Sequence, residues 1–161
     1  MQEQAQAFYQ RSIDDPEGFW GEQAQLIDWK VPPARVLEQP NPPFRQWFAG
    51  GETNLCHNAV DRHLVSRGEQ AALIYLSSET GEERHYTYAE LHQEVNRCAA
   101  VLQSLGVKKG ERVVIYMPMI AEAVFAMLAC ARLGAVHSVV FGGFAAHNLA
   151  LRIDDAKPCL L

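Results

Sequence analysis

The sequence lacks the charge pattern and the long apolar runs that mark proteins bound to nucleic acids or membranes. Its 14 Lys and Arg residues are outnumbered by 19 Asp and Glu residues, which gives a formal net charge of −5. No polybasic surface for nucleic acid or an anionic membrane is therefore expected. Each apolar run is interrupted within a few residues by Glu, Arg or His, so none is long enough to span a bilayer. We expect neither nucleic acid nor membrane among its partners.

Cysteine is scarce as well, and its four copies lie far apart. Cys56, Cys98, Cys130 and Cys159 include no CxxC pair, the spacing common in metal centres and redox motifs. Residues 1–12 show no basic start followed by an apolar run, as a secretory signal would. We expect reduced, mostly buried thiols, no bound metal and a cytoplasmic protein.

The common signatures of nucleotide binding and nucleophilic catalysis are also absent. The sequence has no G-x-x-x-x-G-K-[ST] loop, no G-x-G-x-x-G fingerprint and no G-x-S-x-G elbow. His57 and Asp61 form an i, i+4 pair, but a metal site there would need a further ligand, so a solvated face is the favoured interpretation. For His137 we favour a buried, hydrogen-bonded imidazole over a catalytic base. The residues alone offer no catalytic candidate.

What the sequence does contain falls into two parts, of which the first is rich in proline and tryptophan. Residues 14–51 hold six of the eight prolines and all three tryptophans. One helix is predicted near Asp15–Gln25, with Asp15 as its cap and Pro16 in its first turn. The rest is predicted to be extended chain without a core of its own. We predict that residues 1–52 form an arm against a larger body, with PxxP peptide docking as the alternative.

From residue 53 the apolar pattern becomes regular. A helix is predicted over 53–68, followed by a β-hairpin of strands 71–76 and 85–88. Thr87 and Glu90 form a capping-box signature before a helix that ends at Gly106. The expected apolar face of the first helix consists of Leu55, Ala59, Val60 and Leu64, and that of the second of Leu91, Val95, Ala99 and Leu102.

The remaining residues alternate between strand and helix patterns. Strands are predicted over 111–118 and 136–141, helices over 118–134 and 146–156, and a further strand starts at 158. This alternation predicts an α/β fold, an incomplete doubly wound parallel-sheet layer. Since Leu161 falls within an apolar strand, we predict that residues 53–161 are a truncated part of a larger domain.

The segment "VVFGGF" stands where the strand over 136–141 meets the next helix. Ligands of doubly wound sheets bind at the carboxyl ends of the strands, and the consecutive glycines Gly142 and Gly143 allow a ligand to approach the backbone. The following helix start suits phosphate. A tight strand-to-helix turn that needs glycine for steric reasons alone is the other explanation, and spacing does not decide between them.

Several segments resemble a known family. "WFAGGETNLCHNAVDRHL", "YTYAELHQEVNRCAAVLQSLGVKKGERVVIYMP" and "YMPMIAEAVFAMLACARLGAVHSVVFGGF" are similar to the adenylate-forming acyl-CoA synthetases, in their acetyl-CoA and propionyl-CoA synthetase branch. The leader "FYQRSIDDPEGFWGEQAQLIDW" resembles the N-terminal extension of that branch. Within the branch, "TNLCHNAVDRH", "IYLSSETGEER" and "MPMIAEAVFAMLACARLGA" look most like propionyl-CoA synthetases.

The resemblance implies a function for a longer enzyme. A short carboxylate, propionate or acetate, would react with Mg²⁺-ATP to give an acyl-adenylate, and CoA would then displace AMP. In this family the backbone between "VVF" and "GGF" touches the CoA nucleotide, which implies contacts at Phe141, Gly142 and Gly143. The family's Ser/Thr/Gly-rich phosphate loop, catalytic lysine and carboxylate pocket lie beyond residue 161. The resemblance therefore implies an N-terminal fragment, inactive by itself and without catalytic residues of its own.

Two hypotheses from other classes accompany this one. A non-catalytic α/β module could dock on a partner through the aromatic arm, and a small nucleotide-binding regulator could use the glycine turn. The missing phosphate loop argues against the regulator.

Overall fold

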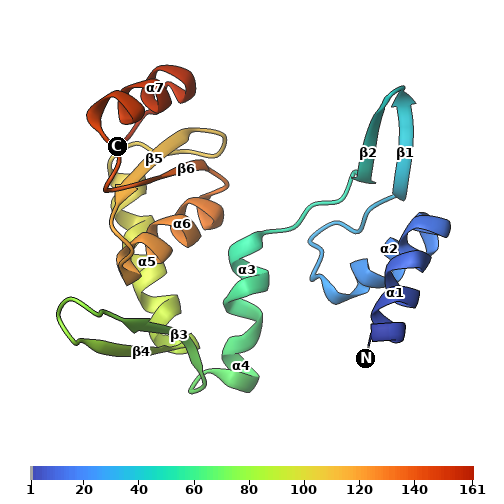
Figure 1. The fold of residues 1–161 in the computed structure, drawn as a ribbon, viewed down its shortest axis with the longest axis horizontal. Helices are drawn as coiled ribbons and strands as arrows, with labels where there is room; N and C mark the ends of the chain where they lie inside the picture. Colours follow the sequence, from blue (N-terminus) through green and yellow to red (C-terminus); the bar gives the residue numbers. More distant parts are fainter. Residues whose placement is uncertain (1) are drawn as a thin grey trace. The chain divides into compact units, whose positions relative to one another are not determined.

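The computed structural model describes residues 2–161, which divide into two compact units between Thr53 and Asn54. Each unit is a separate body with its own elements (Figure 1). No helix of the described residues is long and apolar enough to cross a membrane.

The N-terminal unit consists of two helices and an antiparallel hairpin. Asp15 caps the second helix through a 3.1 Å hydrogen bond from the Gly18 N–H, and Pro16 is its first residue, as predicted. The Phe19 side chain, 2% exposed, contacts the rings of Phe8 and Trp20. The elements are α1 (Gln2–Asp14), α2 (Pro16–Gln23), η1 (Ala24–Leu26), β1 (Arg35–Asn41) and β2 (Phe44–Ala49).

The prediction of a single helix and of extended chain without a core is partly wrong, because α1 was not predicted and the extended strands β1 and β2 pair and pack against a helix. Trp20 of α2 meets Trp47 of β2 with ring centroids 6.1 Å apart, so aromatic side chains link helix to hairpin. The Trp29 indole N–H donates to the Ala24 carbonyl at 2.8 Å. Aromatic rings bury large areas, which lets a short proline-rich segment build a small core without a periodic apolar pattern.

The C-terminal unit is an α/β layer with a hairpin and short helices at its start. Its elements are α3 (Leu55–Ala59), η2 (Asp61–His63), α4 (Leu64–Arg67), β3 (Ala71–Leu76), β4 (Glu83–Thr87), α5 (Tyr88–Ser104), β5 (Arg112–Met117), α6 (Ala121–Leu133), β6 (Val136–Phe141) and α7 (Ala146–Ala156).

The predicted single helix over 53–68 is interrupted. The backbone of Val60 leaves the helical region, with φ −128° and ψ −63°, and the chain continues as a 3-10 turn. The buried residues are Cys56 and Val60, while Leu55 is 64% exposed. The expected apolar face was therefore partly wrong, because Leu55 and Ala59 are exposed and Cys56 is buried in the turn before the break.

The prediction for α5 is confirmed in detail. The Thr87 hydroxyl accepts from the Glu90 N–H at 3.1 Å, and the Glu90 carboxylate accepts from the Thr87 N–H at 2.8 Å. Gly106 has a φ of +91°, the left-handed conformation expected after a helix. The buried residues are the four predicted ones, Leu91, Val95, Ala99 and Leu102.

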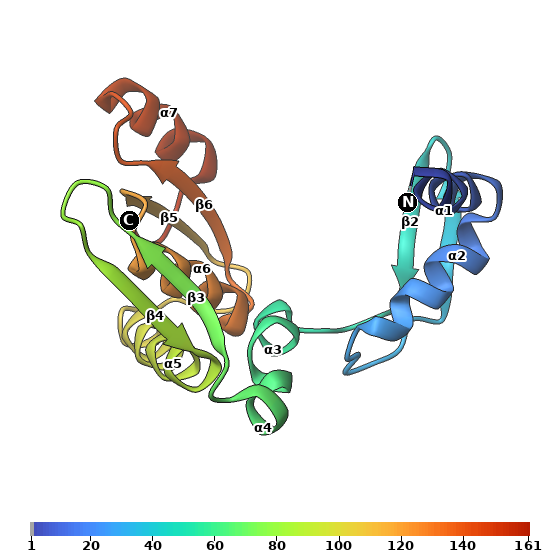
Figure 2. The ribbon, with the colours of Figure 1, turned by 60° about the horizontal axis from the view of Figure 1, so that its bottom comes forward.

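The parallel sheet positions the candidate site. β5 and β6 pair in parallel from Arg112 opposite Val136 to Met117 opposite Phe141. On the other edge of β5, Val113 bridges Leu160 in parallel, where the further strand was predicted. Helices α6 and α7 both pack on these strands, and Figure 2 shows them on opposite faces. This is the α/β arrangement that the sequence predicted.

Two boundaries within this layer add detail. α6 begins at Ala121, three residues after Pro118, where the helix was predicted to start. It ends where predicted, with Gly134 at a φ of +70°.

All four cysteines are free thiols: Cys56 and Cys130 are buried, Cys98 is partly buried, and Cys159 is exposed.

Candidate functional site

The candidate site is the turn at the carboxyl end of β6. Gly142 and Gly143 connect β6 to α7 there, directly beside the end of β5. The Gly142 N–H donates to the Met117 carbonyl at 3.0 Å, which extends the sheet by one bond beyond β6. The turn therefore lies at the edge of the sheet where doubly wound folds bind their ligands.

Gly142 is fixed by the packing of the turn against β5. Neither Gly142 nor Gly143 has a positive φ, so neither is required for a left-handed conformation. A Cβ at Gly142 would lie 3.1 Å from the Met117 carbonyl carbon and the Pro118 nitrogen, both backbone atoms. The steric explanation thus accounts for Gly142 without a ligand.

Two phenylalanines flank the turn. The rings of Phe141 and Phe144 meet edge to face, with centroids 6.0 Å apart, and about half of each side chain is exposed. A Cβ at Gly143 would come within 2.6 Å of the Phe141 ring. Gly143 therefore leaves room for this ring, and the two rings give the turn an apolar rim.

The start of α7 leaves a run of backbone N–H groups unpaired. No side chain caps this helix at Ala145, and its first backbone bonds are donated by Asn148 and Leu149 to the Ala145 carbonyl. Unpaired N–H groups at a helix start, with the positive end of the helix dipole, bind phosphate and carboxylate groups. Within residues 2–161, the N–H groups near the turn that have no acceptor are those of Gly143, Ala145, Ala146 and His147.

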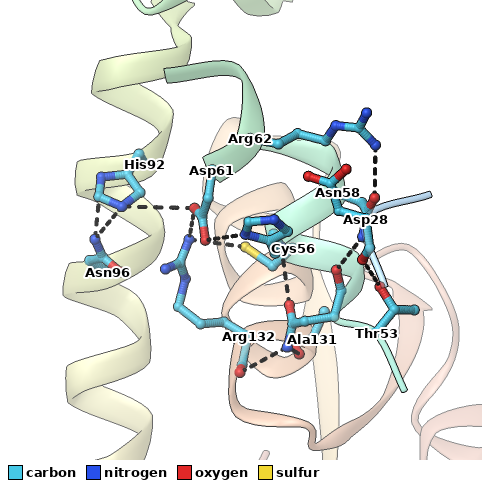
Figure 3. Close-up of polar contacts among 12 residues, drawn as sticks. Asp28, Thr53, Cys56, Asn58, Asp61, Arg62, His92, Asn96, Ala131 and Arg132 are labelled. Atoms are coloured by element: carbon cyan, nitrogen blue, oxygen red, sulfur yellow. Dashed lines mark hydrogen bonds and ion pairs between the residues drawn. The ribbon is translucent and has the colours of Figure 1, made fainter. Parts of the chain in front are cut away.

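A second polar cluster surrounds Asp61 at the start of the C-terminal unit (Figure 3). The Arg132 guanidinium donates to the Asp61 carboxylate at 2.5 Å and to the Cys56 sulfur at 3.2 Å. The rings of His92 and His57 lie 3.8 and 4.0 Å from the same carboxylate. The predicted solvated face is confirmed for His57, whose side chain is 46% exposed, but is wrong for Asp61, because its carboxylate faces α5 and α6.

The cluster joins four elements, α3, η2, α5 and α6. Burial raises the pKa of the Cys56 thiol, although the neighbouring Arg132 opposes this. Burial lowers the pKa of Arg132, but its bonds to Asp61 and Cys56 outweigh that effect and raise it overall. The Asn54 side chain adds hydrogen bonds to the last carbonyls of α6, those of Ala131 and Arg132.

Other predicted candidates are not brought together. His137 is exposed on β6, so the predicted buried imidazole is wrong. Among the described residues, no three His, Cys, Asp or Glu side chains are placed to hold a metal ion.

Sequence reasoning missed the role of Tyr116. Its hydroxyl lies 3.0 Å from both the Gly142 and the Phe144 carbonyl oxygens, so it contacts the turn from β5. Nothing in the pattern of an apolar strand distinguishes this tyrosine from a packing residue.

A parallel α/β layer with a glycine turn at the carboxyl ends of its strands is the arrangement of the doubly wound class of folds, many of which bind nucleotides. Comparison with known families narrows this class. The chain belongs to the AMP-binding enzyme family, which matches residues 60–161. Residues 5–59 match the acetyl-coenzyme A synthetase N-terminus.

Individual relatives agree with this assignment. The chain is 62% identical over 154 residues to propionate–CoA ligase of Escherichia coli K12, covering 96% of this chain and 24% of that protein. It is 53% identical over 157 residues to acetyl-coenzyme A synthetase of Thiobacillus denitrificans, covering 97% of this chain and 24% of the relative. The chain thus spans about a quarter of the length of the curated relatives that it matches.

A solved structure is similar as well. Acetoacetyl-CoA synthetase from Streptomyces lividans matches 92% of this chain and 23% of its own length, with a TM-score of 0.85 and 35% identity.

Proposed function

We propose that this chain is the N-terminal portion of a short-chain acyl-CoA synthetase that forms propionyl-CoA from propionate, ATP and CoA. In this reaction the carboxylate attacks the α-phosphate of ATP, pyrophosphate leaves, and the CoA thiol then displaces AMP from the acyl-adenylate. We expect the enzyme in the cytoplasm.

One observation carries the choice of propionate. The chain is 62% identical to the propionate–CoA ligases of Escherichia coli and Salmonella typhimurium. Its identity to several acetyl-coenzyme A synthetases is 51–53%. Acetate is therefore the second candidate substrate, because the acetyl-coenzyme A synthetases belong to the same family but are less similar to this chain than the propionate–CoA ligases.

We further propose that residues 1–52 form the N-terminal extension of this enzyme and that residues 53–161 form the first part of its AMP-binding domain. Within that part, Phe141, Gly142 and Gly143 are proposed to contact the CoA nucleotide. The unpaired N–H groups after Gly142 support this, because the phosphates of CoA are acceptors of the kind that such groups bind.

The chain contributes binding rather than catalysis in this proposal. Phosphoryl-type reactions are accelerated mainly by positioned charge. The turn between β6 and α7 carries backbone donors and aromatic rings but no Lys or Arg side chain. Mg²⁺ would enter with ATP as part of the substrate. We expect residues 1–161 alone to catalyse no propionate-dependent exchange between ATP and pyrophosphate.

A chimera tests whether this chain can serve as the N-terminal portion of such an enzyme. Residues 1–161 would replace the corresponding quarter of E. coli propionate–CoA ligase, and propionyl-CoA formation would be compared with that of the intact E. coli enzyme. We expect a rate within about tenfold of the intact enzyme, since the two segments are 62% identical. A folded chimera without any ligase activity would support the non-catalytic α/β module instead.

A further inference from the structure

We propose that Tyr116 is a positioning residue that holds the CoA-binding turn in its ligand-accepting conformation. This inference rests on the proposed function, in which the turn after β6 contacts CoA. Tyr116 would act through the backbone of the turn and need not touch the substrate.

The first argument is the rigidity of the strand that carries Tyr116. The three residues before it, Val113, Val114 and Ile115, are each at most 4% exposed. Tyr116 pairs with Val140 across the two strands, and Val140 is 2% exposed. The ring therefore extends from an ordered sheet, while its hydroxyl reaches a turn that belongs to neither a strand nor a helix.

The second argument is the position of the hydroxyl. It lies 3.0 Å from the carbonyl oxygens of both Gly142 and Phe144. A tyrosine hydroxyl has one proton, so it can share that proton between the two carbonyls or alternate between them. One side chain thus fixes two peptide units of the same turn.

The third argument is the direction in which those peptide units point. The C=O and the following N–H of a trans peptide lie in one plane and point in opposite directions. Since the Gly142 and Phe144 carbonyls face Tyr116, the N–H groups of Gly143 and Ala145 face away from it. These two N–H groups are among those without an acceptor in residues 2–161. The tyrosine therefore holds backbone donors outward, where a phosphate oxygen can accept from them.

The hydroxyl, rather than the ring, is the group that matters in this scheme. A phenylalanine at this position would fill the same space and leave the strand packing unchanged. It would remove the hydrogen bonds to the turn and so release the two peptide units. Tyr116→Phe separates a positioning role from a packing role.

Amide hydrogen exchange of the 161-residue chain is the first test. The Phe144 N–H donates to the Phe141 carbonyl at 3.0 Å, and the Gly142 N–H donates to the Met117 carbonyl. We expect Tyr116→Phe to speed exchange at Phe144 about threefold to tenfold, the effect of losing one hydrogen bond. Unchanged exchange at both amides would overturn the positioning role, whatever the function of the protein.

Half-reaction kinetics in the chimera are the second test. We expect Tyr116→Phe to raise the KM for CoA about threefold to tenfold while propionate-dependent exchange between ATP and pyrophosphate stays unchanged. Tyr9→Phe is the matched control, because Tyr9 is 61% exposed in the N-terminal unit, and it should change neither quantity.

The outcomes distinguish the two proposals. An unsubstituted chimera without ligase activity would refute the proposed function. An active chimera in which Tyr116→Phe leaves the KM for CoA unchanged, or lowers both half-reactions equally, would refute the role of Tyr116 alone.

Discussion

The carboxylate of Asp61 should contribute substantially to the stability of the C-terminal unit. It accepts from the Arg132 guanidinium and faces two imidazoles, and replacing it by Asn keeps the shape of the side chain while removing its charge. The Asp61→Asn variant would leave Arg132 without its carboxylate partner. The Nε of this arginine is already buried without an acceptor in the described residues.

The magnitude follows from the burial of the pair. Exposed ion pairs contribute about 0–1 kcal/mol, whereas breaking a fully buried pair costs about 3–5 kcal/mol. The Asp61 and Arg132 side chains are 25% and 22% exposed, which places the pair between these limits. We expect Asp61→Asn to lower the free energy of unfolding by about 2 kcal/mol.

Urea unfolding followed by far-UV circular dichroism measures this loss. A cost of about 2 kcal/mol lowers the midpoint by about 1 M for a typical slope. Glu94→Gln is the matched control, because Glu94 pairs with Arg97 on the surface, and we expect a loss below about 1 kcal/mol. All three tryptophans lie in the N-terminal unit, so their fluorescence reports on that unit separately.

A double-mutant cycle with Arg132→Met isolates the pair. Coupled residues show interaction energies of about 0.5–3 kcal/mol, so Asp61→Asn should cost at least about 1 kcal/mol less when Arg132 is already replaced. Strict additivity, or a loss from Asp61→Asn no larger than that of the Glu94 control, would refute the reasoning.

Three further predictions concern packing, capping and thiols. Gly142→Ala should destabilise the C-terminal unit by about 1–2 kcal/mol, because the new Cβ would press against backbone at 3.1 Å; urea unfolding measures this. Thr87→Ala should cost about 1 kcal/mol through loss of the α5 cap. The hydrogen bond from the Thr87 N–H lowers the pKa of Glu90 below its ordinary 4.5. The contribution of this carboxylate to the free energy of unfolding is therefore fully present above pH 4.5 and is lost as the pH falls through the lowered pKa. At pH 8, a thiol reagent should label exposed Cys159 rapidly and buried Cys130 slowly, since burial raises the pKa of Cys130 to about 11.

Each of these has a result that would contradict it. Gly21→Ala in α2 is the control for the glycine, because its Cβ would meet only a methyl group of Val36 at 3.4 Å. Equal losses at both positions would argue against the backbone clash. The role given to the Glu90 carboxylate requires the acid dependence of stability to be weaker in Glu90→Gln, so an unchanged dependence in that variant opposes it. Equal labelling of the two thiols would show that the core around Cys130 opens readily.

The C-terminal unit could be predicted from sequence to the extent that local signals determine it. The capping box of Thr87 and Glu90 is a local signal, and so is Gly106, the glycine that follows the end of α5. The strand and helix patterns after residue 111 gave the parallel pairing, because apolar runs alternate there at the spacing of βαβ units.

The remaining features depend on contacts between distant residues. Arg132 lies 71 residues after Asp61, so no short sequence pattern reveals that this arginine pairs with the Asp61 carboxylate. The hydroxyl of Tyr116 finds its acceptors 26 and 28 residues later. In the N-terminal unit, the Trp20–Trp47 contact joins a helix to a hairpin, and proline content alone suggested extended chain instead.

The most direct test of the account is the contact between the glycine turn and CoA, measured in the chimera. Phe141→Ala removes a half-exposed ring beside the turn, and Val139→Ala removes a similarly exposed side chain two residues earlier on the same strand. We expect Phe141→Ala to raise the KM for CoA about tenfold without changing propionate-dependent exchange between ATP and pyrophosphate. Val139→Ala should leave both unchanged. A KM for CoA that is the same in Phe141→Ala as in the unsubstituted chimera would contradict the account.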